Sequence, residues 1–233
     1  MGNIVILPET TKNPITLIGM RAGVCWGGDT QDAEKNYKRG LDCITANHGR
    51  TLEYVNVEMI LDGYSARVVR EWYTHIGGAP TRLQSSTRYI NYQKGFDYVI
   101  PPSVKKDARA NEAYVQAMER ILSSLEKLEE LGIAREDSAM LLPLGMATRI
   151  VDKRNLRNLM DMSRQRMCAR AYWEYRQLFA DLSGALSGYS EEWKWIVENL
   201  FMPKCDALGY CTEKKSCGRH QRGQDGRPGR GND

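Results

Sequence analysis

The sequence predicts an α+β protein with a modest mixed sheet and several long helices. Apolar residues recur at intervals of three and four in the middle of the chain, as on one face of a helix. Short β-branched runs bounded by proline or glycine lie near the N-terminus, which is typical of strands. With 233 residues, 42% of them hydrophobic and 27% charged, the chain can bury a core. We expect a single folded domain over residues 1–218.

The first part of the chain predicts three strands and two helices. Strands are expected at Ile4–Leu7 and Ile15–Ile18, and the apolar run Leu52–Leu61 is expected to be a third, ended by Asp62 and Gly63. Asp32–Ala46 has a helical pattern. A second helix is expected from Tyr64 until Gly77, Gly78 and Pro80 end it.

The remainder is predicted to be mostly helical. Tyr89–Ile100 alternates aromatic or β-branched residues with polar ones and predicts a strand or hairpin. Asp107 is expected to cap the next helix, which ends at Gly132. A long helix is expected over Lys153–Leu182, and a short one over Glu191–Leu200. The stripe of the helix after Asp107, typical of a core or a subunit interface, comprises Tyr114, Met118, Ile121, Leu125 and Leu128.

The charge pattern separates a tail from the folded part. Net charge is +4, and residues 219–233 are basic, rich in glycine and free of apolar side chains, which predicts a disordered tail. A solvated extension is the simpler interpretation, and a tail that binds RNA or DNA is the alternative. No apolar run reaches the roughly 20 residues of a membrane span, and no secretory signal begins the chain. We expect a cytoplasmic protein.

Six cysteines raise the question of a metal. The first three are expected to be reduced packing residues. The last three form the pattern C-x5-C-x5-C-x2-H, whereas zinc sites usually have closer pairs. Free thiols in a loop are therefore the expectation, and a metal site stays open. The last group comprises Cys205, Cys211, Cys217 and His220.

Two sets of side chains suit an anionic ligand. In the first, Arg82, Gln84, Ser86 and Arg88 alternate, so an extended segment would point them to one side. Gly77 and Gly78 precede them and would let the backbone approach a ligand closely. Glu71 and His75 share one face of the preceding helix.

The second set lies on the long predicted helix. At 100° per residue, Asn155, Arg166, Arg170 and Trp173 fall near one face. Arginine binds phosphate in a bidentate manner and stacks on rings, so this face suits a phosphate and a flat heterocycle. Acidic residues of a neighbouring subunit are the other partner that such a face would fit.

From about Met20 to Arg176, the order of motifs resembles the flavin-dependent thymidylate synthases. That family has an Arg-His-Arg triplet followed by S-x-N-x-x-S-x-R-Y, and this chain departs at the triplet. A gapped alignment places Thr74-His75-Ile76 there, and an ungapped one places Ile76-Gly77-Gly78. Other departures are Glu71, Gln84, Ala139 and Arg170. The matching segments are Ser86-Thr87-Arg88-Tyr89, Asp62–Trp72, Leu142-Pro143-Leu144, Asn155-Leu156-Arg157, Arg166 and Trp173-Glu174.

The resemblance implies an enzyme that makes dTMP from dUMP by reductive methylation. It implies FAD as the cofactor, with NADPH and methylene-tetrahydrofolate as cosubstrates. It also implies a homotetramer whose active sites form between subunits, with no membrane or nucleic-acid partner. Residues 1–218 would be the catalytic domain.

The resemblance also implies a role for each matching residue. Arg166 would contact the uracil ring and act in catalysis. Ser86 and Arg88 would hold dUMP, chiefly its phosphate, and Glu71 and Gln84 would make further nucleotide contacts. Arg82 or Arg170 would replace the charges missing from the triplet. The residues expected to bind the flavin or folate are His75, Asn155 and Arg157.

Other functions remain open at this stage. The altered triplet would also fit a related enzyme that makes a hydroxymethyl nucleotide. The basic tail and the arginine-rich faces would fit a non-enzymatic protein that binds RNA or nucleotides. A helical assembly protein, whose stripes are only interfaces, is the remaining alternative.

Overall fold

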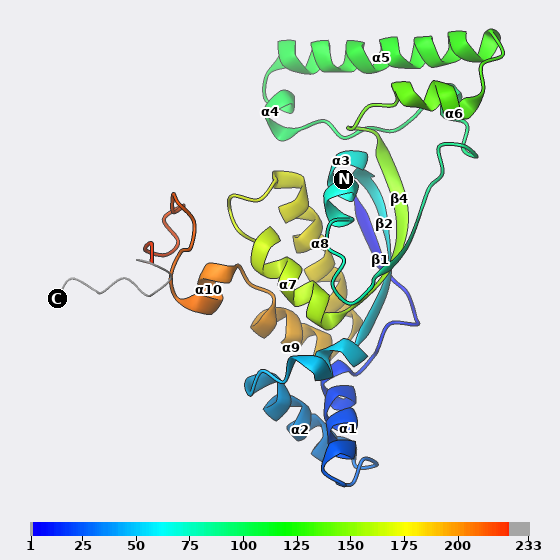
Figure 1. Ribbon diagram of the computed structural model, residues 1–233. Helices are drawn as coiled ribbons and strands as arrows, with labels where there is room; N and C mark the ends of the chain where they lie inside the picture. Colours follow the sequence, from blue (N-terminus) through cyan, green and yellow to red (C-terminus); the bar gives the residue numbers. More distant parts are fainter. Residues whose placement is uncertain (1, 224–233) are drawn as a thin grey trace. The chain divides into compact units, whose positions relative to one another are not determined.

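A computed structural model describes residues 2–223 (Figure 1). Its contacts divide the chain into two compact units. The first unit comprises residues 2–3, 60–74 and 82–151, and the second comprises 4–59, 75–81 and 152–223. The single domain expected over residues 1–218 stays a prediction.

Four strands form one sheet in the order β1-β2-β4-β3. They are β1 (Asn3–Ile6), β2 (Asn56–Ser65), β3 (Thr81–Gln84) and β4 (Ala147–Asn155). Strands β1 and β2 run antiparallel, because Leu7 N donates to Glu58 O and Thr11 N donates to Asn56 O, both at 2.9 Å. With the helices described below, this sheet confirms the predicted α+β class.

Strand β2 begins and ends four residues later than the predicted Leu52–Leu61. Asp62 and Gly63 were expected to end it, yet it continues to Ser65. Gly63 adopts φ +74°, which glycine tolerates inside a strand. Asp62 pairs with Arg149 of β4, so its polar side chain has a partner in the sheet.

Both units contain several helices (Figure 1). The first unit contains α3 (Ala66–Trp72), α4 (Pro102–Lys105), α5 (Ala108–Glu130) and α6 (Arg135–Ser138), with short 3-10 turns η2 (Tyr92–Lys94) and η3 (Ala139–Leu141). The second unit contains α1 (Pro14–Cys25), α2 (Ala33–Thr45), η1 (Gly49–Tyr54), α7 (Leu156–Arg166), α8 (Trp173–Tyr189), α9 (Glu191–Leu200) and α10 (Lys204–Leu208). None of the helices within residues 2–223 has the length and apolar character needed to cross a bilayer.

The strand predicted at Ile15–Ile18 is wrong, because these residues lie in α1. Pro14 occupies the first turn, where its fixed φ suits a helix. Glu192 of α9 caps this end: its carboxylate accepts from Ile15 N at 2.6 Å and Thr16 N at 3.0 Å. A negative charge at a helix N-terminus is stabilising, and this one comes from a distant part of the chain.

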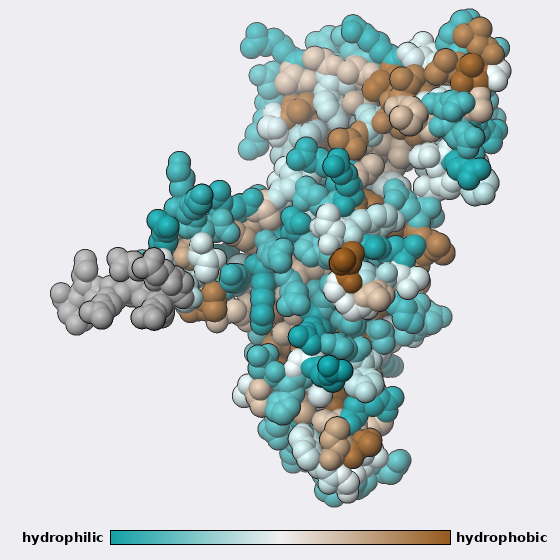
Figure 2. Space-filling model, in the orientation of Figure 1, coloured by the Kyte–Doolittle hydropathy of each residue, from teal (hydrophilic) through white to brown (hydrophobic). Residues whose placement is uncertain are grey.

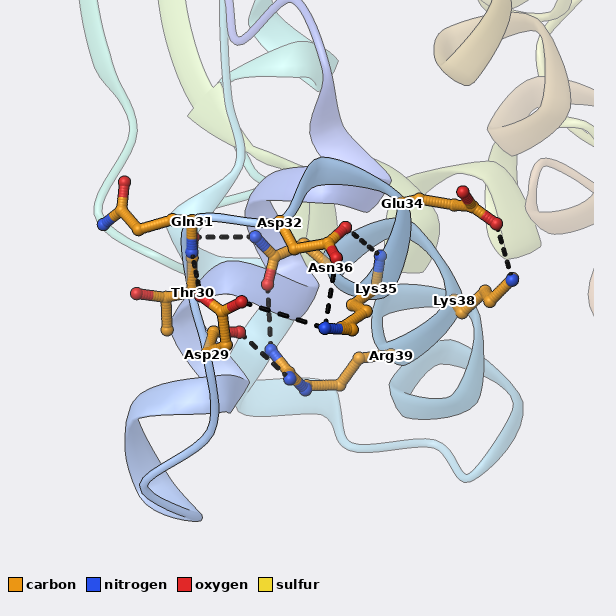
Figure 3. Close-up of polar contacts among 9 residues, drawn as sticks. All are labelled: Asp29, Thr30, Gln31, Asp32, Glu34, Lys35, Asn36, Lys38 and Arg39. Carbon is orange, nitrogen blue, oxygen red and sulfur yellow. Dashed lines mark hydrogen bonds and ion pairs between the residues drawn. The ribbon is translucent and has the colours of Figure 1, made fainter.

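Helices α1 and α2 cross closely at two glycines. A Cβ on Gly19 would lie 1.8 Å from Asn36 O, and one on Gly40 would lie 2.0 Å from Ile15 O. The helix predicted over Asp32–Ala46 is confirmed as α2, with Asp32 as its N-cap. Figure 3 shows the polar contacts around its first turns, where Asn36 donates to Thr30 O at 2.8 Å. Arg39 donates to Asn36 Oδ1, also at 2.8 Å. These contacts fix the loop between the two helices.

The helix after Asp107 is confirmed as α5. Asp107 caps it by accepting from Arg109 N at 2.9 Å and Ala110 N at 3.1 Å. Of its apolar stripe, only Met118 and Leu125 are buried within this chain. The strand predicted over Tyr89–Ile100 is wrong, since that stretch holds η2 and a single β-bridge at Tyr98.

The long helix predicted over Lys153–Leu182 is also wrong. Its first residues belong to β4, where Asp152 and Arg154 are buried as a pair. Asn155 then caps α7 by accepting from Asn158 N at 2.9 Å. Alternating burial in β4 was obscured by its charged residues, so the sequence read as helical. The final helix predicted, Glu191–Leu200, is confirmed as α9.

Candidate functional site

Three segments of the second unit meet at Arg166, the last residue of α7. Its Nε donates to His75 Nε2 at 3.0 Å. Its guanidinium lies 4.6 Å from the ring centre of Tyr175, which is fully buried in the first turn of α8. The His75 ring meets Tyr175 edge-on, with 6.1 Å between the centroids. Arg166 is therefore held in one orientation from two sides.

His75 is neutral at physiological pH. Burial first, and then the positive charges of Arg166 and Arg154, together lower its pKa from 6.5 to about 4. Because Nε2 accepts the hydrogen bond from Arg166, the ring proton sits on Nδ1. Neutral His75 acts here as an acceptor that orients the guanidinium.

A buried ion pair, Arg154 with Asp152, lies near this cluster, and the charge of Arg154 acts on His75. Arg154 donates from Nε to Asp152 Oδ2 at 2.5 Å and from Nη2 to Oδ1 at 2.7 Å, with both side chains fully buried. Its Nη1 also donates to Asn158 Oδ1 at 2.7 Å. Sequence reasoning missed this pair and Tyr175. The alternation of β4 was the signal that could have revealed Arg154.

The glycine pair approaches two asparagines at the start of α7. A Cβ on Gly78 would lie 2.1 Å from Asn155 Nδ2, and one on Gly77 would lie 3.0 Å from Asn158 Nδ2. Gly78 also has φ +73°, which disfavours other residues. These glycines thus hold the segment of His75 against the N-terminus of α7.

A pocket of about 920 Å³, the large pocket, lies at the C-terminal end of α7. Arg164, Arg166 and Arg170 line it together with residues of the C-terminal segment between Lys204 and His220. Arg170 forms an exposed ion pair with Glu213 at 3.4 Å. The predicted helix face with Asn155 and Trp173 is wrong, because α7 ends at Arg166 and α8 begins at Trp173. Arg166 and Arg170 nevertheless line the same pocket.

A second pocket, the small basic pocket, has a volume of about 310 Å³. Three arginines line it, Arg50, Arg157 and Arg164, beside a single acid, Asp161. Arg157 also bonds Glu53 at 2.6 Å across an exposed contact. An excess of guanidinium groups in a hollow suits phosphate or diphosphate.

In the first unit, Arg82 and Gln84 lie on β3 and already have partners. Arg82 donates to Tyr73 O at 3.0 Å and lies over the Tyr73 ring at 4.4 Å. Gln84 donates to Thr148 Oγ1 at 3.3 Å. Glu71 lies near the end of α3, where its carbonyl accepts from the Thr74 hydroxyl at 2.7 Å.

The predicted alternation of four side chains on one side fails after Gln84. The chain turns at Ser86, whose carbonyl accepts from Tyr89 N and Ile90 N at 3.3 and 3.1 Å. The Ser86 hydroxyl accepts from Arg88 N at 3.2 Å. Arg88 itself is largely exposed and pairs with Glu136 at 2.9 Å. Its convergence with Arg166 of the second unit stays a prediction.

Comparison with known proteins gives a consistent result. The family model described as thymidylate synthase complementing protein matches residues 7–186. A flavin-dependent thymidylate synthase from Nitratidesulfovibrio vulgaris is 30% identical over 190 residues, covering 76% of this chain and 74% of the relative. One from Clostridium tetani is 29% identical and covers 94% of each.

The chain belongs to the flavin-dependent thymidylate synthase family. Its fold is that of a solved member, thymidylate synthase X from Helicobacter pylori complexed with FAD and dUMP. The TM-score is 0.67 at 18% identity, over 85% of this chain and 99% of that one.

Proposed function

We propose that this protein is a FAD-dependent thymidylate synthase that methylates dUMP to dTMP. The arrangement of His75, Tyr175 and Arg166 carries the proposal, because it orients one guanidinium toward a large pocket in a chain of this family. NADPH and methylene-tetrahydrofolate are the cosubstrates we propose.

Arg166 is the catalytic residue in this proposal. A guanidinium aimed at a uracil carbonyl would stabilise negative charge that develops on the pyrimidine ring. His75 is neutral and accepts from Nε, so it orients Arg166 without adding a competing positive charge. Ser86 and Arg88 would hold the phosphate of dUMP; Arg88 would then exchange its exposed contact with Glu136 for a bidentate one. Gln84 and Glu71 would make the remaining nucleotide contacts.

The second unit offers a donor set that fits the diphosphate of FAD. The small basic pocket supplies Arg50, Arg157 and Arg164, and a diphosphate would compete with Glu53 for Arg157. Asn155 and His75 lie at the start of α7 and beside its end, where they would contact the flavin. Once reduced by NADPH, bound FAD would supply the hydride that completes the methyl group.

Of the two arginines that could replace the missing triplet charges, we propose Arg170. Arg82 is held by Tyr73 through both a hydrogen bond and its ring. Arg170 lines the large pocket, and its contacts within residues 2–223 are exposed ones to Glu213 and Lys215 O, which an anion can displace. Arg170→Ala should weaken dUMP binding more than Arg82→Ala. Unchanged affinity for dUMP in both variants would show that neither arginine replaces the missing triplet charges.

We propose that the enzyme is a homotetramer with active sites between subunits. The stripe of α5 is only partly buried within this chain. Apolar residues gather at the end of α5 and beside α6 in Figure 2, and an exposed patch of this kind is typical of an interface. The exposed members are Leu131, Ile133, Met140 and Leu141.

The activity is tested by incubating the purified protein with dUMP, methylene-tetrahydrofolate, NADPH and FAD. The mass of the product separates dTMP from a hydroxymethyl nucleotide. Arg166→Ala should lower turnover by about 100-fold or more, the loss typical of one transition-state donor. Arg21→Ala is the matched control, because Arg21 is exposed on α1. Normal turnover by Arg166→Ala would refute the assignment.

A further inference from the structure

The C-terminal segment, residues 204–223, folds with almost no apolar core. Of its residues only Cys211 is buried. The segment is nevertheless closed on itself, since Cys211 N donates to Gln221 O at 2.8 Å and Gly223 N donates to Cys211 O at 3.0 Å. Small structures that lack a core are usually held by a disulfide or a metal.

Three metal-ligating side chains meet at the base of this segment. Cys205, Asp206 and His220 each offer one ligand atom, and these atoms all lie within 4.8 Å of one another. His220 Nε2 is 2.9 Å from Asp206 Oδ1, and Cys205 Sγ is 3.8 Å from that same oxygen. Cys205 and Asp206 lie in the first turn of α10, whereas His220 comes from the far end of the segment.

These separations are close to the edges of a tetrahedral zinc site. Zinc binds sulfur at about 2.3 Å and nitrogen or oxygen at about 2.0–2.2 Å. With tetrahedral angles, those bonds put nitrogen about 3.4 Å from oxygen and sulfur about 3.6 Å from oxygen. For the three side chains to share one ion, the nitrogen–oxygen separation would have to widen by about 0.5 Å and the sulfur–oxygen separation to close by about 0.2 Å.

Two further cysteines line the same pocket and can supply a fourth ligand. Cys168 and Cys217 line the same large pocket as Cys205 and His220, and neither is buried. Arg219 donates to the second oxygen of Asp206 at 2.7 Å, which is the outer contact that often orients a ligating carboxylate. Its positive charge also offsets the excess negative charge of two thiolates and a carboxylate around a divalent ion.

We propose that Cys205, Asp206 and His220 bind a structural zinc ion, with a fourth thiolate from Cys217 or Cys168. The ion closes the C-terminal segment in place of a hydrophobic core, so it fixes one wall of the large pocket. The order C-x5-C-x5-C-x2-H lacks the close cysteine pairs of common zinc motifs, because here the fold brings the ligands together. Zinc takes no part in the methylation, and the proposal stands apart from that activity.

The test is the zinc content of the full-length protein, purified without a histidine tag and measured by mass spectrometry. We expect about one zinc per chain, as for a closed structural site. Cys205→Ser, His220→Ala and the double variant Cys168→Ser/Cys217→Ser should each lose at least about nine-tenths of it, since a structural site needs all four ligands. Cys25→Ser and His48→Ala are matched controls that should keep it, because neither residue lines the large pocket.

Cobalt gives a second readout that does not depend on activity. The apo-protein with Co²⁺ should show the thiolate charge-transfer and tetrahedral bands, and Cys205→Ser should lack them. The proposal is overturned if wild type neither retains zinc nor takes up added Zn²⁺ in competition with a colorimetric chelator. Equal zinc in wild type and Cys205→Ser, or a disulfide at Cys205 in the freshly purified protein, would also overturn it.

Discussion

At the scale of single residues, the chemistry depends on how Arg166 is oriented. His75 accepts its Nε–H and the Tyr175 ring lies 4.6 Å from its guanidinium. Burial and the charges of Arg166 and Arg154 lower the pKa of His75. A protonated imidazole in this position would repel both arginines. The site therefore requires neutral histidine.

Lowering the pH should reveal this requirement in the stability of the protein. Below pH 6.5 the unfolded chain protonates His75, while the folded protein resists protonation until about pH 4. The contribution of His75 to the free energy of unfolding therefore falls as the pH drops through this window, and it is constant above it. His75→Gln keeps an acceptor but does not titrate.

The measurement is the thermal midpoint of wild type and His75→Gln between pH 7.5 and 4. As the pH falls below about 6.5, the thermal midpoint of wild type should decrease more than that of the variant. Parallel curves for the two proteins across that range would show that His75 titrates normally.

At the scale of secondary structure, close packing between helices α1 and α2 rests on Gly19 and Gly40. A Cβ at Gly40 would lie 2.0 Å from a backbone oxygen, which cannot move without shifting the helix. Gly40→Ala should therefore cost about 1–3 kcal/mol, as overpacking does.

Gly184 of α8 is the matched control for that substitution, because a Cβ there would meet nothing within 4 Å. Gly184→Ala should stabilise the protein by about 0.5–1 kcal/mol through helix propensity. Both values come from urea unfolding followed by circular dichroism. A Gly40→Ala variant that is at least as stable as Gly184→Ala would contradict the close crossing.

Strand β4 has a comparable dependence on one buried pair. Asp152→Ala would leave the Arg154 guanidinium buried without its bidentate partner, at a cost of about 3–5 kcal/mol. Replacing both residues, as in Asp152→Leu/Arg154→Met, should cost much less, because neither charge of the pair is then left without the other. Chemical denaturation of the two variants decides this, and the account fails if the single variant is the more stable one.

At the scale of the whole molecule, local signals predicted more than long-range ones did. Helices with their own caps, such as α2 with Asp32 and α5 with Asp107, were predicted close to their observed ends. Helix α1 was missed because its cap, Glu192, lies far along the chain. Strand β4 was missed because burial of Asp152 and Arg154 becomes visible only when they pair.

The same division holds for the site. Arg166 and His75 were predicted from motifs, and the fold brings them into contact. Tyr175 and Arg154 belong to no recognisable sequence motif, so their part in the site becomes visible only in the folded structure. The segment from Arg219 onward was expected to be a tail; residues 219–223 contact α10 and Cys211, and residues 224–233 lie outside the described part of the chain.

The central claim is that binding of dUMP depends on Arg88 and on Arg166, as proposed above. Equilibrium binding of dUMP to the FAD-loaded protein, measured by calorimetry, tests it most directly. Arg88→Ala and Arg166→Ala should each weaken binding by about 10-fold or more, as expected for a lost charged hydrogen bond, whereas Arg21→Ala should not. Wild-type affinity for dUMP in either the Arg88 or the Arg166 variant would contradict the claim.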